Sequence, residues 1–237
     1  MSRGPEGIYL VLDLDVCASA GHHPADVARA AVVAGVGAVQ VRAKRAPVRE
    51  QVAVTVAVAD ALRLAGPALL VVDDRVDVAL AARARGALVH GVHVGQGDLA
   101  VDDVRALLGA DAVVGVSAAR PQDVRAVPGA ADYVGSGPVR LTATKPDAGP
   151  ALGLDGLAAA VAASSLPVVA IGGLAADDAP AVRATGARSM AVVGAVCGAP
   201  DPGAAAQALV AAWSAAAPPP GADGADRSST GRAAVAR

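Results

Sequence analysis

The chain has almost no aromatic residues. Its 237 residues include no Phe, one Trp and two Tyr, although 54% of them are hydrophobic. A core must therefore be packed from Ala, Val and Leu. Charged residues make up only 18% of the sequence, and this balance gives too much apolar material for a disordered chain. The composition predicts a globular protein with a large buried core.

An excess of charge of one sign is also missing. The formal net charge is −2, and no stripe of Lys and Arg alternates with aromatic residues. These two absences argue against a nucleic-acid-binding surface. If the protein binds phosphate groups, it must do so with a few local side chains or backbone groups.

Cysteine is scarce, and long uninterrupted apolar runs are lacking. Cys17 and Cys197 are too few for a disulfide framework, which favours a reducing compartment. The first residues lack the apolar stretch of a signal peptide. The uncharged run over residues 156–176 approaches the length of a membrane span, but Pro167 and the pair Gly172-Gly173 interrupt it. We expect a cytoplasmic protein that does not enter the membrane.

What the sequence does contain is a regular alternation of strands and helices. Runs rich in Val and Ile predict strands over residues 8–13, 38–42, 69–73, 91–94, 113–117, 133–135, 167–171 and 189–193. Helices are predicted between them, over residues 24–34, 49–64, 76–84, 101–108, 121–126, 154–162, 177–184 and 202–216.

This alternation predicts a parallel sheet closed into a single-domain (β/α)8 TIM barrel over residues 1–217. An open, doubly wound sheet is the alternative, but it would normally carry a glycine-rich turn after the first strand, where none stands. Residues 218–237 are rich in Pro, Gly and Ser, and we expect a disordered tail there.

Polar residues collect where the predicted strands end, which is where barrel enzymes place their active sites. The second strand ends in Gln40-Val41-Arg42-Ala43-Lys44. Alternation puts Gln40, Arg42 and Lys44 on one face, which in a barrel is the interior or its mouth. Cations buried there call for an anion. The simpler interpretation is that both cations extend outward from a surface strand.

Two carboxylates follow the next two strands. Asp74 follows the third strand and Asp98 follows the fourth, so that both come to neighbouring strand ends. A few carboxylates, completed by water and phosphate oxygens, are the usual protein site for Mg²⁺. Asp also caps helices commonly, so the prediction depends on the nearby Arg42 and Lys44. His93 lies in an apolar strand, and we expect it to be a packed structural residue.

Glycines and hydroxyls mark the remaining strand ends. Ser117 ends the fifth strand, and a loop after the sixth strand carries Thr142-Ala143-Thr144-Lys145. The last two strands lead into Gly172-Gly173 and Gly194, where backbone N–H groups can face a phosphate. Simple turn glycines are the alternative. Two anion sites at one mouth suggest two phosphorylated small-molecule substrates bound side by side.

These residues resemble the thiamine phosphate synthase family. The matching segments run in order from residue 40 to residue 196. They are QVRAK at 40–44, VDDRVDVAL at 72–80, GVHVGQGDL at 91–99, GVS at 115–117, DYVGSGPV at 132–139, TATK at 142–145 and AIGG at 170–173. The AIGG turn alone occurs in many phosphate-binding barrels, but the ordered set is specific.

The resemblance implies an Mg²⁺-dependent transferase. It would condense 4-amino-2-methyl-5-hydroxymethylpyrimidine diphosphate with a thiazole ethyl phosphate and release diphosphate by a dissociative mechanism. Arg42, Lys44 and Lys145 would hold the diphosphate, Gln40 and Ser117 would lie near the pyrimidine, and Asp74 and Asp98 would bind the metal. We assign catalysis to Arg42, Lys44, Ser117 and Lys145, and substrate binding to these together with Gln40, Val41, Ala43, Asp73, Thr142, Ala143, Thr144, Gly172, Gly173, Val193 and Gly194.

Three positions depart from the family pattern. Asp73 stands where related sequences usually have Asn, and either Arg75 or the metal is expected to offset its charge. Gly194 replaces a common Ser. Ala119 replaces a His found in the thiazole tautomerases, a sister family, so its absence argues against a tautomerase. A catalytically silent sensor of pathway phosphates is a third hypothesis, favoured only by Asp73. A homodimer is possible.

Overall fold

The computed structural model describes residues 3–142 and 149–217 and shows eight parallel strands closed into a barrel. The strands follow one another around the barrel in chain order, and β1 pairs with β8 to close it. The predicted (β/α)8 fold is therefore confirmed. The strands are β1 (Gly7–Asp13), β2 (Ala38–Arg42), β3 (Leu69–Asp73), β4 (Gly91–Val94), β5 (Val113–Ser117), β6 (Tyr133–Ser136), β7 (Val168–Ile171) and β8 (Ser189–Val192).

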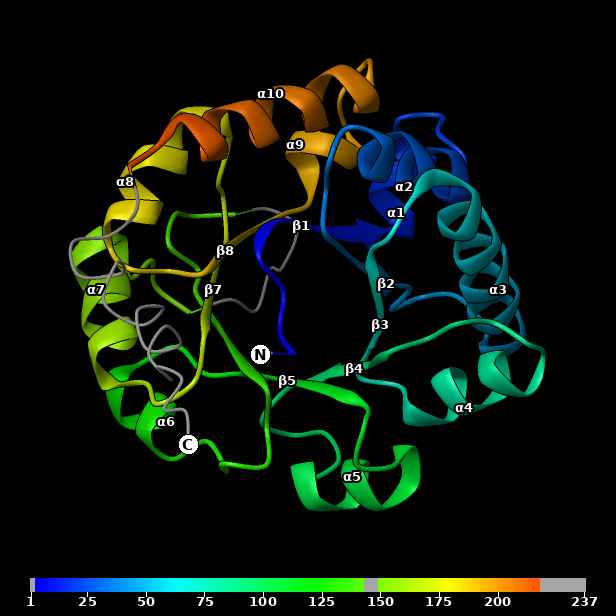
Figure 1. Ribbon diagram of the computed structural model, residues 1–237, viewed down its shortest axis with the longest axis horizontal. Coiled ribbons are helices and arrows are strands. Elements are labelled where there is room, and N and C mark those ends of the chain that lie inside the picture. The colour runs from blue at the N-terminus through cyan, green and yellow to red at the C-terminus, as the bar shows by residue number, and fades with distance from the viewer. Residues whose placement is uncertain (1–2, 143–148, 218–237) are drawn as a thin grey trace, which may run out of the picture.

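Helices surround the barrel (Figure 1). They are α1 (Leu14–Ser19), α2 (Pro24–Val33), α3 (Val48–Ala65), α4 (Val76–Ala84), α5 (Val101–Leu108), α6 (Pro121–Arg125), α7 (Gly153–Ala163), the 3-10 turn η1 (Ala176–Asp178), α8 (Ala179–Ala184), α9 (Gly194–Cys197) and α10 (Pro202–Ala215). All eight predicted helices are found, with small changes at their ends. The short helices α1 and α9 were not predicted, and Val193, expected in the last strand, instead precedes α9.

Polar side chains fix several helix starts. The Asp201 side chain accepts a hydrogen bond of 3.0 Å from the Ala204 N–H, and Pro202 occupies the first position of α10. In the same way Asp13, the last residue of β1, accepts from the Asp15 N–H at 3.0 Å. Because Asp13 caps α1 directly, the chain turns into a helix at the mouth of the barrel without a loop.

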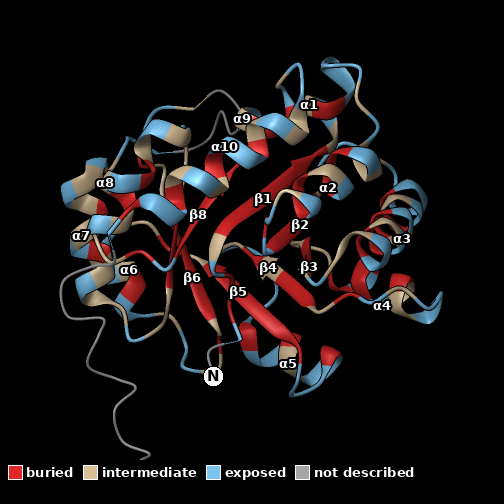
Figure 2. Cartoon of the chain, turned by 45° about the horizontal axis from the view of Figure 1, so that its top comes forward, coloured by how far each residue is buried: buried red, intermediate tan, exposed pale blue. Residues whose placement is uncertain are grey.

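Alternation along the strands separates two apolar layers. In β1, Tyr9 and Val11 point into the lumen, whereas Leu10 and Leu12 pack outward against the helices. Figure 2 shows the strands almost entirely buried and the outer faces of the helices exposed. The lumen is filled by a small separate cluster made of Tyr9, Val11, Ala38, Val71, Val113, Tyr133, Val169 and Ala191.

Both tyrosines of the chain occupy this lumen, and glycine makes room for them. A Cβ on Gly115 would lie only 2.1 Å from Tyr133 Cζ and 2.5 Å from His93 Nδ1. Tyr9 and Tyr133 meet edge to face, with ring centroids 6.2 Å apart. The chain therefore places both of its tyrosines inside the barrel, where a glycine leaves space for the Tyr133 ring.

The N-terminal ends of the strands form the base of the barrel. Arg105 on α5 donates to Ala130 O and to the Asp132 carboxylate at 2.7 Å, and the same carboxylate accepts from the Val114 N–H at 2.7 Å. Arg83 donates to three backbone carbonyls of the chain between α4 and β5. The charges at the base are thus paired with groups of the fold itself.

Candidate active site

A large cavity opens at the C-terminal ends of the strands. Its volume is about 1120 Å³, slightly above the range that suffices for one drug-sized ligand. Every strand or the segment after it contributes residues to its lining, including Asp13 at the end of β1, Asp98 after β4, Ser117 on β5 and Gly194 after β8. The predicted position of the site, at the mouth of the barrel, is where the structure places this cavity.

One side of the mouth carries a charged cluster, which consists of Asp13, Arg42, Lys44, Asp73 and Asp74. Arg42 forms an ion pair with the buried Asp13, and its Nε lies 3.7 Å from Asp73 Oδ2. Lys44 Nζ lies 3.1 Å from Asp73 Oδ2 and also pairs with Asp74. The two predicted cations therefore point into the mouth and not outward, as the alternation along β2 predicted.

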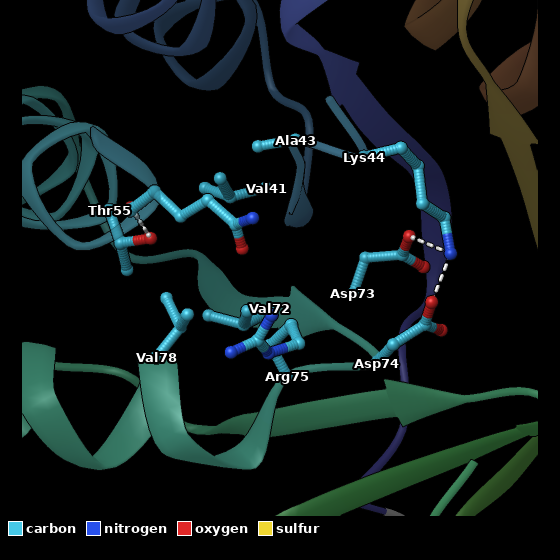
Figure 3. Close-up of a pocket in the computed structure, with 10 residues that line it drawn as sticks. Val41, Ala43, Lys44, Thr55, Val72, Asp73, Asp74, Arg75 and Val78 are labelled. Atoms are coloured by element: carbon cyan, nitrogen blue, oxygen red, sulfur yellow. Dashed lines mark hydrogen bonds and ion pairs between the residues drawn. The ribbon is translucent and has the colours of Figure 1, made fainter. Parts of the chain in front are cut away.

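Asp73 is held from three sides within this cluster. Its Oδ1 accepts a hydrogen bond of 2.9 Å from Gln40 Nε2, while its buried Oδ2 has only the two cations nearby. Arg75, one of the two expected partners, instead pairs with Asp77 through two hydrogen bonds. In Figure 3 Lys44 lies between Asp73 and Asp74, and Arg75 points away from both.

The surroundings of Asp73 and Asp74 disfavour the ionised form of each carboxyl group. Burial raises the pKa of Asp73, although Lys44 and Arg42 oppose this shift. Burial and the neighbouring charge of Asp73 likewise raise the pKa of Asp74, to which Asp98 adds a smaller contribution. Although burial alone would lower the pKa of Lys44, its contacts with Asp74 and Asp73 raise it. Negative charge is thus concentrated where the sequence predicts a metal.

The residues present fit a hard divalent cation. Asp74 and Asp98 line the same cavity, and their electrostatic interaction shows that they lie near each other. Asp98 Oδ2 accepts from the Gly95 N–H at 2.8 Å, which fixes the loop that presents it. No group of three or more His, Cys, Asp or Glu arranged for a metal is found in the described part of the chain. The two carboxylates Asp74 and Asp98 match the way proteins usually hold Mg²⁺, with water and phosphate oxygens as the other ligands.

Two predicted binding residues lie apart from the large cavity. Val41 and Ala43 line a smaller cavity of about 90 Å³ between β2, β3 and the helices α3 and α4 (Figure 3). Val41 also belongs to the apolar layer outside the barrel. Their side chains alternate with those of Arg42 and Lys44, so they support β2 from the opposite face.

A chain of hydrogen bonds crosses the lumen below the mouth. His93 Nε2 lies 2.9 Å from Ser117 Oγ, its Nδ1 lies 3.1 Å from the Tyr133 hydroxyl, and that hydroxyl lies 3.1 Å from the Tyr9 hydroxyl. Burial raises the pKa of both tyrosines, so both remain protonated. His93 was expected to be a packed structural residue, but it is only half-buried and lines the large cavity, where it contacts Ser117.

The other side of the mouth is formed by the backbone. Gly172, Gly173, Val193 and Gly194 line the cavity together with Thr142. Gly173 has φ +63°, and a Cβ there would lie 2.6 Å from Leu141 O. Chain neighbours aside, no described residue lies within 4 Å of the place where Gly194 would carry a Cβ. Three further predicted binding residues, Ala143, Thr144 and Lys145, lie outside the described residues.

The two cysteines come together beneath the charged cluster. Cys17 on α1 and Cys197 on α9 are both fully buried and free, and each thiol influences the pKa of the other. Cys197 Sγ also contacts Val11 O at 3.6 Å. The packing of α1 against α9 therefore brings the two thiols near each other.

Asp13 is a candidate site residue that the sequence interpretation missed. It is only 4% exposed, forms the ion pair with Arg42 and lines the large cavity. The register of β1 against β2 pairs Asp13 with Arg42, so a strand alignment would have found it.

Comparison with known proteins assigns the family. The sequence matches the model of the thiamine monophosphate synthase family over residues 8–196, a stretch that contains all eight strands except the first residue of β1. The chain belongs to this family. The match includes the whole charged cluster and the glycines of the opposite side. It thus confirms the resemblance on which the site assignments rest.

Individual members of the thiamine monophosphate synthase family are close in sequence. The thiamine-phosphate synthase of Corynebacterium efficiens is 50% identical over 183 residues, which cover 76% of this chain and 84% of that protein. The thiamine-phosphate synthase of Laribacter hongkongensis is 46% identical over 204 residues, covering 86% of this chain and 93% of that protein. The chain is a transferase of thiamine biosynthesis, as these relatives indicate.

Solved structures agree with this assignment. Thiamine phosphate pyrophosphorylase from Pyrococcus furiosus superimposes with a TM-score of 0.76 at 32% identity, covering 88% of this chain and 95% of that one. Orotidine 5'-phosphate decarboxylase from Pyrococcus horikoshii, at 13% identity and a TM-score of 0.62, shares the fold alone. No helix within the described ranges is long and apolar enough to cross a membrane.

Proposed function

We propose that this transferase condenses 4-amino-2-methyl-5-hydroxymethylpyrimidine diphosphate with a thiazole ethyl phosphate, giving thiamine phosphate and diphosphate. The observation that carries the proposal is one cavity with two unlike anion-binding sides. The charged cluster suits a diphosphate with a metal, and the glycine side suits a phosphate monoester. The volume of about 1120 Å³ leaves room for both substrates at once.

Mg²⁺ would be held by Asp74 and Asp98, and when bound it would withdraw charge from the leaving diphosphate. Arg42 and Lys44 bind the same oxygens and stabilise the charge that they gain as the C–O bond breaks. Asp13 keeps Arg42 directed into the mouth, because its carboxylate pairs with the guanidinium and also caps α1. Cleavage of the C–O bond leaves a pyrimidinylmethyl cation.

The central residues position the pyrimidine and exclude water. Ser117 Oγ stands at the cavity wall, held 2.9 Å from His93 Nε2, and Gln40 is fixed by its bond to Asp73. The thiazole nitrogen then attacks the pyrimidinylmethyl cation, and the new C–N bond completes the product. Neither step needs a protein nucleophile, so the residues act through charge and orientation.

The glycine side would bind the phosphate of the thiazole. Gly173 and Gly194 allow the phosphate to approach the backbone without meeting a side chain. Thr142 lines this part of the cavity and offers a hydroxyl. Ala119, also in the lining, provides no imidazole for a thiazole tautomerase.

The test is a diphosphate-release assay with purified protein, both substrates and Mg²⁺, in which each component is omitted in turn. We expect release that requires the pyrimidine diphosphate and the metal, with thiamine phosphate formed only when the thiazole is present. A change in the ultraviolet absorbance of the thiazole phosphate, seen when it is the only substrate present, would instead show a tautomerase. Binding of both ligands without turnover would show a sensor.

A further inference from the structure

We infer that Asp73 is an internal counter-ion of the diphosphate site. In this role it weakens the binding of free diphosphate and makes that binding depend more steeply on the metal. The inference rests on the proposed function, because it takes the charged cluster to be the place where diphosphate binds. It concerns Asp73, whose carboxylate lies beside both cations of the charged cluster.

The contacts of Asp73 are those that an anionic ligand would need. Its Oδ2 lies 3.1 Å from Lys44 Nζ and 3.7 Å from Arg42 Nε, the two cations that face the cavity from β2. Its Oδ1 accepts the Gln40 amide at 2.9 Å. A diphosphate oxygen that reaches these cations must compete with a carboxylate already attached to the protein.

The balance of charge in the cluster supports the same conclusion. Arg42 and Lys44 bring two positive charges, whereas Asp13, Asp73 and Asp74 bring three negative ones. Asp98, on the same cavity, adds a further negative charge. Without a metal, the cluster therefore repels an anion despite its two cations. A neutral Asn at position 73 would remove one of these negative charges from beside Lys44.

The neighbouring cation does not cancel this charge. Arg75 follows Asp73 by two positions but pairs with Asp77, through bonds of 2.8 Å from Nε and 2.5 Å from Nη2. The charge of Asp73 is therefore directed at Lys44 and Arg42. The same charge attracts a divalent cation, so its effect on diphosphate should shrink when the metal is bound. A weaker hold on diphosphate also favours release of this product.

The experiment measures binding of inorganic diphosphate to the full chain by calorimetry, first with a chelator and then with Mg²⁺. Asp73→Asn removes the charge and keeps an oxygen for the Gln40 amide. Asp102→Asn makes the same change of charge on the exposed first turn of α5 and serves as the matched control. Without metal, we expect Asp73→Asn to bind diphosphate about ten-fold more tightly than wild type and Asp102→Asn to stay within about two-fold. With Mg²⁺ the ten-fold difference should narrow to about three-fold.

Each other result contradicts the inference. Equal or weaker metal-free binding by Asp73→Asn would overturn it while leaving the proposed function intact. Absence of binding by both wild type and variant, even with Mg²⁺, would remove the diphosphate site itself and the proposed function with it. If Asp73→Asn does not fold, Asp73→Ser removes the same charge, and the same comparison decides.

Discussion

The two ends of the barrel use charge in opposite ways. At the base, Arg105 shares the Asp132 carboxylate with a backbone N–H and donates to the Ala130 carbonyl, so that each group has a partner in the fold. At the mouth, carboxylates outnumber cations, and burial raises the pKa of Asp73 and Asp74. The base is therefore arranged for stability. The mouth is left with unbalanced charge that ligands can offset, which is the usual division in this fold.

The largest expected effect is at the mouth, in Asp98→Asn. Asn keeps an oxygen for the Gly95 N–H but is a poor ligand for Mg²⁺. We expect kcat/KM to fall about a thousand-fold, the equivalent of roughly 4 kcal/mol of charge stabilisation. Initial rates over a series of Mg²⁺ concentrations measure this change. Asp102→Asn, on the exposed first turn of α5, is the control, and an unchanged Mg²⁺ dependence in Asp98→Asn would refute the metal assignment.

The next largest effect is at the base, in Arg105→Met. This change leaves Asp132 without its cation and removes the bonds to Ala130 O, so we expect a loss of about 3 kcal/mol in the free energy of unfolding. Denaturant titration measures this loss, while kcat of the folded fraction should stay the same. Arg63→Met on α3 is the control, because Arg63 makes only an exposed pair with Asp60 at 3.8 Å. A fall in kcat without a loss of stability would contradict the division between base and mouth.

The third largest effect is expected from Gly173→Ala, on the glycine side of the mouth. A Cβ at φ +63° is strained and would press on Leu141 O at 2.6 Å, so the loop on the glycine side must move. We expect KM for the thiazole phosphate to rise about a hundred-fold, as is typical when a binding group shifts by an ångström. Steady-state kinetics with each substrate varied test this. Gly129→Ala, with open space around it, is the control, and a rise in KM for the pyrimidine substrate alone would place the phosphate elsewhere.

The sequence predicted the features that are set by neighbouring residues, but not those that depend on residues far apart in the chain. The strands and the residues at their ends were predicted, because a short run of Val and Ile and the polar residue after it are local features. The helices α1 and α9 were missed, since six and four residues are too few to show a period. Contacts across the barrel were also missed: Tyr9 and Tyr133 are 124 residues apart, and only the closed sheet brings their hydroxyls to 3.1 Å.

A pH-dependent effect on stability is expected from His90 at the base. Burial lowers the pKa of His90, whose Nδ1 accepts the Leu70 N–H at 2.9 Å. The unfolded chain therefore binds the proton more readily than the folded one. This contribution to stability is fully present above about pH 6.5 and is lost as the pH falls below that value. Unfolding titrations from neutral to acidic pH should show this slope, and His90→Asn should flatten it. An equal slope in both proteins would contradict the assignment.

The smallest expected effect is that of Gly194→Ser. Chain neighbours aside, no described residue lies within 4 Å of the added Cβ, so Tm should not change. The hydroxyl would donate to the phosphate of the thiazole, and we expect KM for that substrate to fall about three-fold, the effect of one modest hydrogen bond. Steady-state kinetics measure this, with Gly194→Ala as the matched variant without a hydroxyl. An equal improvement in Gly194→Ala would show that the hydroxyl is not involved.

The single tryptophan of the chain gives the molecule a built-in optical probe. Trp213 on α10 is 8% exposed, lies under the Arg183 guanidinium at 5.5 Å, and its Cδ1 is 3.9 Å from the position of a Cβ on Gly7, the first residue of β1. It therefore sits at the seam where the first and last strands meet. Its fluorescence should report the pairing of β1 with β8 during folding, because the chain contains no second tryptophan.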